Sequence, residues 1–195
     1  MNLLPNDSTP LDAEELQGLR LSYVSSRREL NVAESRNVEA GVRWAGKARR
    51  VDEVLDISFL KALHLAMFGD VWRWAGTFRK TDKNIGVPWW EITIALTQLT
   101  LDVTAWVSGG SLAWTADEIG VRFHHRLVAI HPFPNGNGRH SRLAADLLVE
   151  ALGEQRFSWG RVQLADPSIT RASYITALQS ADRNDMSLLL NFARS

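Results

Sequence analysis

The segment from His131 to Arg142 combines residue types that can bind and act on an anion. It reads HPFPNGNGRHSR. Glycines allow a backbone to approach a ligand closely, and the free amide groups at the start of a helix, with the helix dipole behind them, bind anions. Because this segment leaves one apolar helical pattern and enters another, we expect a phosphate at the start of the second helix.

Two arginines follow the glycines of this segment. Arg139 and Arg142 lie three residues apart, so on a helix both guanidinium groups project from about the same face. A cation near a helix N-terminus costs roughly 0.3–1 kcal/mol. Two such cations indicate that an anion lies between them; the alternative is that both face solvent.

His131 opens the segment. Its ordinary pKa allows it to take a proton from an attacking hydroxyl group near neutral pH. A single histidine after an apolar helix is more often structural, so the residues that follow it carry the argument for catalysis.

Apolar residues at steps of three and four predict the helices that position this segment. One runs over 115–130, where Thr115 and Glu118 fit a capping box, and the next runs from 137 to about 152 and stops at Gly153. The same pattern predicts helices over 56–68, 91–106, 168–181 and 185–193. We therefore expect an all-α chain.

The segment 74–89 is the exception. Gly76, Gly86 and Pro88 surround a polar run, which favours a short β-hairpin flap, or an ordered loop, over a helix. We expect residues 1–50 to form an N-terminal helical segment and residues 51–195 to form the core with the C-terminal helices.

The composition is that of a folded protein. The 195 residues are 45% hydrophobic, carry equal numbers of acidic and basic side chains, and include no cysteine, which excludes disulfides and thiolate metal sites. The absence of a basic excess disfavours nucleic acid as a partner, and no apolar run of about 18 residues or signal-like start points to a membrane. We expect a cytoplasmic protein whose eight tryptophans mostly line the core or a pocket.

The segment resembles the signature of the Fic family, H-x-F-x-[DE]-G-N-G-R-x-x-R, at every fixed position except one. The run from Val71 to Arg79 and the helix with Phe123, His124 and His125 also look like this family, and the likeness covers roughly 56–152. The whole chain looks most like the bacterial subgroup called mobile mystery protein B. The resemblance implies an all-helical Fic fold that transfers AMP from ATP to a Ser, Thr or Tyr hydroxyl of a protein target. The subgroup implies a partner protein with a helix-turn-helix domain.

The resemblance also implies roles for single residues, with Phe133 anchoring the loop in the core. In the motif these are His131 as general base, Gly136, Asn137 and Gly138 around the α- and β-phosphates, Arg139 at the β-phosphate and Arg142 at the γ-phosphate. The flap that aligns the target chain by strand-like pairing would comprise Arg79, Lys80, Thr81, Asp82, Lys83, Asn84 and Ile85.

Asn135 is the one departure from the signature. It stands where the family has an acid that holds Mg²⁺, and hard divalent cations favour carboxylates over neutral amides. Three outcomes are open: Mg²⁺ held mainly by the nucleotide phosphates, altered chemistry such as phosphate or UMP transfer, or nucleotide binding without turnover.

Many members of the family carry an inhibitory helix with the pattern [ST]-x-x-x-E-[GN], whose Glu pairs with the second arginine of the motif. Ser25 and Glu29 fit this pattern, although Leu30 stands where Gly or Asn is expected. The resemblance thus implies a pair between Glu29 and Arg142; the alternative is a solvated charged helix face.

Overall fold

The computed structural model describes residues 18–46, 50–109, 114–160 and 167–195. Its helices are α2 (Arg27–Ala45), α3 (Val51–Val54), α4 (Ile57–Phe68), the 3-10 helix η1 (Trp89–Glu91), α5 (Ile92–Ser108), α6 (Ala116–Ile130), α7 (Asn137–Ala151), α8 (Pro167–Ala181) and α9 (Ser187–Arg194). These ranges contain no strand, and one isolated antiparallel bridge joins Leu19 to Trp72. The predicted all-α class is confirmed.

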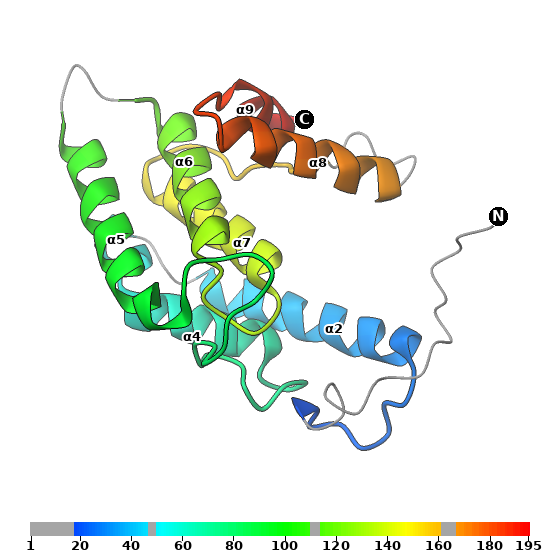
Figure 1. The fold of residues 1–195 in the computed structure, drawn as a ribbon. Helices are drawn as coiled ribbons and strands as arrows, with labels where there is room; N and C mark the ends of the chain where they lie inside the picture. The colour runs from blue at the N-terminus through cyan, green and yellow to red at the C-terminus, as the bar shows by residue number, and fades with distance from the viewer. Residues whose placement is uncertain (1–17, 47–49, 110–113, 161–166) are drawn as a thin grey trace.

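The helices α6 and α7 pack against each other, and the loop between them carries the motif (Figure 1). On one side α4 contacts α7 and supports α2, and α5 packs along α6. The pair α8 and α9 lies at the other end of the bundle, where α9 contacts α6. The motif loop is therefore surrounded by elements from the whole length of the chain.

Local signals in the sequence define the two central helices. Glu118 donates its N–H to the hydroxyl of Thr115 (3.2 Å) and accepts the N–H of Thr115 (2.8 Å), which confirms the predicted capping box at the start of α6. Gly153 follows the end of α7 in the left-handed region, with a φ of 93°. The apolar face of α6 is fully buried, which places the helix in the core.

Leu30 of α2 and Leu189 of α9 belong to one buried apolar cluster with the central helices. The domain boundary at residue 50 stays a prediction, and residues 1–17 and 47–49 lie outside the described ranges. No helix in the described part of the chain is both long enough and apolar enough to cross a membrane.

The tryptophans do not follow the prediction. Four of the eight are exposed: Trp44 (41%), Trp89 (43%), Trp90 (59%) and Trp114 (38%). For these four, the expectation of a place in the core or a pocket wall is wrong. Trp89 and Trp90 are exposed because they form η1, before the first buried position of α5 at Ile92.

The β-hairpin predicted for the flap is also wrong, and the alternative of an ordered loop holds. No ladder forms over residues 77–88. The N–H of Arg79 donates to the carbonyl of Pro132 (2.9 Å), and the N–H of Val87 donates to that of Ile130 (3.3 Å). The two ends of the flap thus bond to the motif loop and to the last residue of α6 instead of to each other.

Candidate functional site

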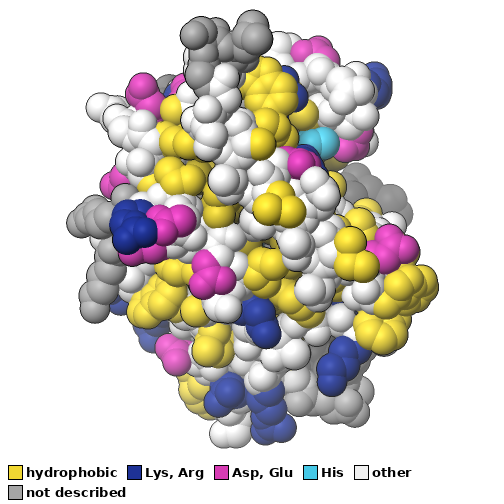
Figure 2. Space-filling view, turned by 90° about the vertical axis from the view of Figure 1, so that its left-hand side faces the viewer, with side chains coloured by type: hydrophobic (Ala, Val, Ile, Leu, Met, Phe, Trp, Pro, Cys, Tyr) yellow, Lys and Arg dark blue, Asp and Glu magenta, His cyan; other side chains and the backbone are white. Residues whose placement is uncertain are grey.

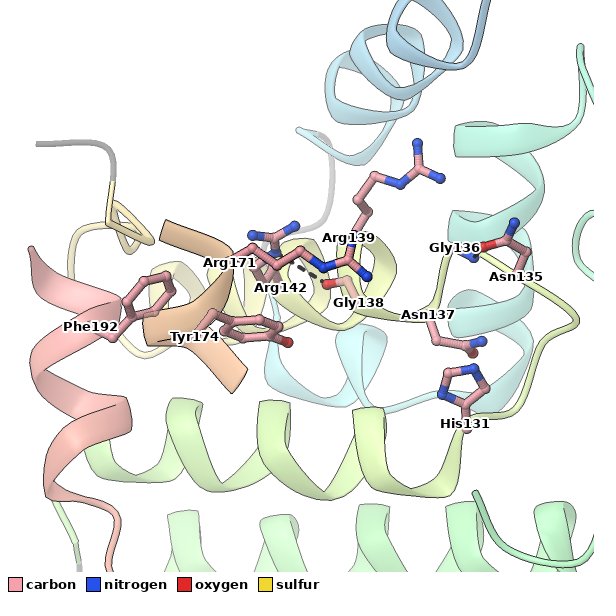
Figure 3. A pocket seen from close by; sticks show the side chains of 10 residues that line it. All are labelled: His131, Asn135, Gly136, Asn137, Gly138, Arg139, Arg142, Arg171, Tyr174 and Phe192. Atoms are coloured by element: carbon pink, nitrogen blue, oxygen red, sulfur yellow. Dashed lines mark hydrogen bonds between the residues drawn. The ribbon is translucent and has the colours of Figure 1, made fainter. Parts of the chain in front are cut away.

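A cavity of about 520 Å³ lies at the start of α7. That volume is within the range of pockets that hold small ligands. Figure 3 shows His131 at one end and Phe192 of α9 at the other, with Arg142 and Tyr174 between them. The lining consists of His131, Asn135, Gly136, Asn137, Gly138, Arg139, Arg142, Arg171, Tyr174 and Phe192.

The N-terminus of α7 is open towards this cavity. Gly136 is its N-cap and contributes no side-chain cap, and the first helical bond runs from the N–H of His140 to the carbonyl of Gly136 (3.0 Å). The amides between these residues have no intrahelical acceptor. Gly136 is required here, because its φ is 77° and an added Cβ would lie 2.6 Å from the ring of Phe68. This backbone can bind a phosphate.

The side chain of Asn137 holds the backbone of the motif loop. Its Oδ1 accepts the N–H of Phe133 (2.9 Å), and its Nδ2 donates to the carbonyl of the same residue (2.8 Å). The residue is only 3% exposed. Asn137 therefore fixes the shape of the loop, and its backbone N–H is the group left for a phosphate.

His64 of α4 also holds the motif loop. Its Nδ1 accepts the N–H of Gly76 (3.0 Å), so the proton lies on Nε2, which donates to the carbonyl of Asn135 (3.0 Å). The ring stacks on Phe133 with centroids 3.7 Å apart. Burial lowers the pKa of His64 to about 2, so the ring stays neutral. No local pattern marks this role, because His64 lies far from the motif in sequence.

His131 takes the C-cap position of α6 in the left-handed region, with a φ of 54°. Its side chain is half-buried at the end of the cavity. Burial is the main cause that lowers the pKa of His131, and the charges of Arg79 and Lys83 lower it further. The backbone of Val128 acts in the opposite direction and raises it. The imidazole is therefore neutral near pH 7 and can accept a proton, as a general base requires.

Arg79 needs a correction. It was expected in the target-binding flap, but it is only 3% exposed. Its guanidinium donates to the carbonyls of His131 (2.7 Å) and Thr81 (2.9 Å), and also to that of Val87. A buried guanidinium whose donors meet backbone carbonyls cannot contact a target. The other predicted flap residues, from Lys80 to Ile85, are exposed.

Arg139 is engaged by an acid on α2. Its Nη1 donates to Oε2 of Glu34 (2.9 Å), while the indole N–H of Trp72 donates to Oε1 (2.7 Å). Glu34 is 7% exposed, and the Arg139 guanidinium lies 4.7 Å from the centroid of Phe68. Figure 3 shows Arg139 extending away from His131. Sequence reasoning missed Glu34, although a carboxylate one turn after buried Leu30, on the apolar face of a helix, is a detectable signal.

The predicted inhibitory residues Ser25 and Glu29 lie at the exposed start of α2. The carboxylate of Glu29 accepts the N–H of Ser25 (2.9 Å), the hydroxyl of Ser25 (3.2 Å) and the N–H of Ser26 (3.1 Å). These bonds lower the pKa of Glu29. Glu29 thus caps its own helix, and Glu34 of the same helix pairs with Arg139. The expected pairing is corrected accordingly.

Arg142 lines the cavity. Its Nε donates to the carbonyl of Gly138 (3.3 Å), and its guanidinium is 5.4 Å from the ring centroid of Tyr174. The hydroxyl of Tyr174 is 3.0 Å from Nε2 of buried His124. Burial raises the pKa of Tyr174 to about 12 and lowers that of His124 to about 3, so this pair is neutral.

Three residues that line the cavity were not predicted from the sequence. Arg171, Tyr174 and Phe192 come from α8 and α9, which follow the motif by a long stretch of chain. Their positions depend on how these helices pack, and no local spacing indicates it.

The residues present do not fit a magnesium site built by the protein. Asn135 is exposed, and its Oδ1 accepts the N–H of Gly136 (2.6 Å). Among the residues that the structure describes, no three His, Cys, Asp or Glu side chains are grouped so that they could hold a metal ion. The oxygen of the neutral amide is thus already hydrogen-bonded to the backbone.

Solved structures with the same fold come from a nematode and from bacteria. A Fic-1 chain from C. elegans is 24% identical with a TM-score of 0.64, and the match covers 89% of this chain and 50% of that one. BepC from Bartonella tribocorum, solved with bound AMPPNP, is 17% identical with a TM-score of 0.69 over 98% of this chain and 93% of that one. A Fic domain from Bartonella quintana, solved with bound ADP, is 18% identical with a TM-score of 0.67 over 98% and 92%.

These likenesses establish the fold, and this chain spans half of the length of the Fic-1 chain. The mobile mystery protein B subgroup stays a prediction. Residues 54–149 match the Fic/DOC family model, and they include the whole motif loop and most of α7. With its motif loop at the start of α7, this part of the chain is similar to the Fic/DOC family domain.

Proposed function

We propose that this chain transfers the AMP group of ATP to a Ser, Thr or Tyr hydroxyl of a protein target. The observation that carries the proposal is His131, a neutral base at one end of a cavity whose wall is the open N-terminus of α7. The binding of AMPPNP by BepC and of ADP by the B. quintana domain supports a nucleotide in this cavity. The helix-turn-helix partner implied by the subgroup belongs to the same proposal.

In the proposed step, the hydroxyl oxygen of the acceptor attacks the α-phosphorus of ATP. The bond from the α-phosphorus to the bridging oxygen breaks, pyrophosphate leaves, and His131 takes the proton of the hydroxyl group. The amides at the start of α7 and the guanidinium of Arg142 offset the charge of the phosphates. No step passes through a protein-bound metal, because the side chains around Asn135 do not form a site for one.

Labelled ATP tests this reaction. Purified protein with α-labelled ATP and Mg²⁺ should label itself or an added target, and His131→Ala should reduce labelling about 10²- to 10⁴-fold. The matched control is His125→Ala, because His125 pairs with Asp182 outside the cavity (2.8 Å) and labelling should persist. Label from γ-labelled ATP alone would indicate phosphate transfer, and stronger labelling from UTP would indicate UMP transfer; either result contradicts the proposal.

We also propose that the resting chain is restrained through Glu34. While Glu34 holds Arg139, that guanidinium is not free to bind a phosphate. Glu34→Gln retains an oxygen acceptor for Trp72 and removes the charge, so it should increase labelling and tighten ATP binding. Glu29→Gln is the control, because Glu29 caps the far end of the same helix. Unchanged labelling in the Glu34 variant would contradict the restraint.

A second candidate is a nucleotide-binding protein without turnover. The observation that favours it is Asn135, whose oxygen is bonded to Gly136 where the family signature has an acid. Calorimetry would then show ATP binding, while neither Asn135→Asp nor Glu34→Gln would label anything. A gain of labelling in Asn135→Asp would instead support the enzyme.

A further inference from the structure

Two adjacent tryptophans form an exposed aromatic surface where the flap enters α5. Trp89 and Trp90 are 43% and 59% exposed, and their rings meet edge to face with centroids 5.9 Å apart. Ile94, one helical turn after Trp90, is 72% exposed. Large apolar side chains grouped on a surface mark interaction sites, whereas single exposed ones are common.

This surface is fixed relative to the motif loop. The carboxylate of Asp82 accepts the N–H of Trp89 (3.0 Å), which ties the flap to η1. The N–H of Val87 donates to the carbonyl of Ile130, the residue before His131 (3.3 Å). A chain that lies on the tryptophans is therefore held at a defined position relative to His131.

The flap beside this surface carries unpaired positive charge. Lys80 and Lys83 are exposed, and no carboxylate in the described ranges forms an ion pair with either. Asp82, between them, already contacts Trp89 and lies 3.6 Å from the guanidinium of Arg79. The positive charge of Lys83 also lowers the pKa of His131.

We propose that this surface selects the acceptor protein by its chemistry. The aromatic patch comprises Trp89 and Trp90, with the exposed Ile94 one helical turn after Trp90. It takes a bulky apolar side chain of the acceptor segment, while Lys80 and Lys83 take an acidic side chain on the flap side of the acceptor hydroxyl. The inference rests on the proposed function, because it names the substrate class of the same site.

The distribution of charge sets the direction of the acceptor segment. Glu91 is exposed at the start of α5 and disfavours a second carboxylate there. The acid therefore belongs beside the flap and the apolar residue beside α5. Figure 2 shows the side of the molecule that α5 forms, with hydrophobic side chains on the surface and several Lys and Arg side chains at the lower end.

Three labelled peptides test this selection. The first places Glu residues on one side of a central Thr and Leu and Phe on the other; the second has Lys for Glu, and the third has Ala for Leu and Phe. Fluorescence anisotropy of each peptide with the full chain measures binding without ATP. We expect the first peptide to bind at least about tenfold more tightly than the other two.

Two variants probe the two halves of the surface. Trp90→Ala should remove the preference for Leu and Phe, and Lys83→Glu should reverse the preference between the Glu and Lys peptides. Leu101→Ala is the matched control, because Leu101 is 60% exposed on the same helix, away from the flap, and binding should not change. Circular dichroism confirms that each variant is folded.

The outcomes separate this inference from the proposed function. Equal binding of all three peptides, or an unchanged preference in both variants, overturns the selection even if the chain transfers AMP. Selective binding without any labelling from α-labelled ATP supports the surface as a docking site and counts against the transfer reaction.

Discussion

The motif loop and the flap lie side by side, and backbone hydrogen bonds join the flap to Pro132 of the loop and to Ile130 just before it. The two loops are nevertheless built in opposite ways. In the motif loop, buried side chains hold the backbone: Asn137 closes it onto Phe133, and His64 holds Asn135. In the flap, the side chains from Lys80 to Ile85 face solvent. Several buried hydrogen bonds thus fix the backbone of the motif loop, whereas most side chains of the flap are exposed.

Because of this difference, the flap should tolerate substitution better than the motif loop. Leaving a buried polar group without its hydrogen-bond partner costs about 1–3 kcal/mol, whereas exposed substitutions away from such contacts usually change stability by about 0.5 kcal/mol or less. The motif loop can therefore keep His131 in a left-handed conformation that few residues adopt. Substitutions of the exposed flap side chains should therefore cost little stability.

The largest effect is expected when the motif loop loses its internal bonds. Asn137→Ala leaves the buried N–H and carbonyl of Phe133 without partners, so the free energy of unfolding should fall by about 2–5 kcal/mol and ATP binding should weaken. Urea denaturation and calorimetry measure both. Asn84→Ala, in the exposed flap, is the control and should change neither. Similar losses in both variants would contradict the contrast between the loops.

The next largest effect is expected from acid, which should lower the stability of the fold through the buried histidines next to the motif loop. Burial lowers the pKa of His140 to about 4 and that of His64 to about 2, while both titrate near 6.5 in the unfolded chain. Below pH 6.5 the unfolded state therefore binds more protons, and stability should fall as the pH falls. For His140 alone the full loss is about 3 kcal/mol.

Thermal denaturation between pH 7 and 5 measures this loss. His140→Gln should make the melting temperature of the chain less sensitive to acid than that of the unsubstituted protein. A melting temperature that does not change over this pH range would contradict the conclusion that His140 and His64 are buried in the neutral form.

A smaller effect is expected where the two loops join. Arg79→Lys keeps the charge, but a single ammonium group cannot reach all the carbonyls that the guanidinium holds, so we expect a loss of about 1–3 kcal/mol. Because the start of α7 is untouched, ATP binding should persist while binding of the acidic peptide weakens. If ATP binding failed and peptide binding persisted, the assignment of the two loops would be reversed.

The smallest effect is expected in the pH dependence of the reaction. The pKa of His131 is lowered, so the labelling rate should stay level below pH 7 and fall only at a pH under 6.5. Lys83→Ala removes one of the charges that lower this pKa, so the fall should move to higher pH by less than about one unit. A shift in the opposite direction would contradict the electrostatic coupling.

Sequence reasoning succeeded where the cause is local. Helix periods, the cap at Thr115 and the open start of α7 depend on neighbours within a few residues. The pattern Ser-x-x-x-Glu was misleading for the same reason, since Glu29 satisfies it through its own helix cap. Glu34 gains its role only through tertiary packing, which brings it to Arg139 and Trp72.

The flap shows the same limit. Its polar, glycine-containing sequence fits a hairpin, and the residue that decides otherwise is Arg79. The buried guanidinium of Arg79 donates to the carbonyls of Thr81 and Val87, which lie within the flap. The cavity wall of Tyr174 and Phe192 likewise depends on the packing of α8 and α9. Such contacts become visible once helices far apart in sequence are placed together.

The pair between Glu34 and Arg139 makes nucleotide affinity a measure of how firmly the N-terminal helix is attached. If ATP and Glu34 compete for the same guanidinium, the factor by which α2 weakens ATP binding equals the factor by which bound ATP weakens the attachment of α2. A protein that draws α2 away would then raise nucleotide affinity without touching the cavity. Saturating ATP would, in turn, make α2 easier to capture.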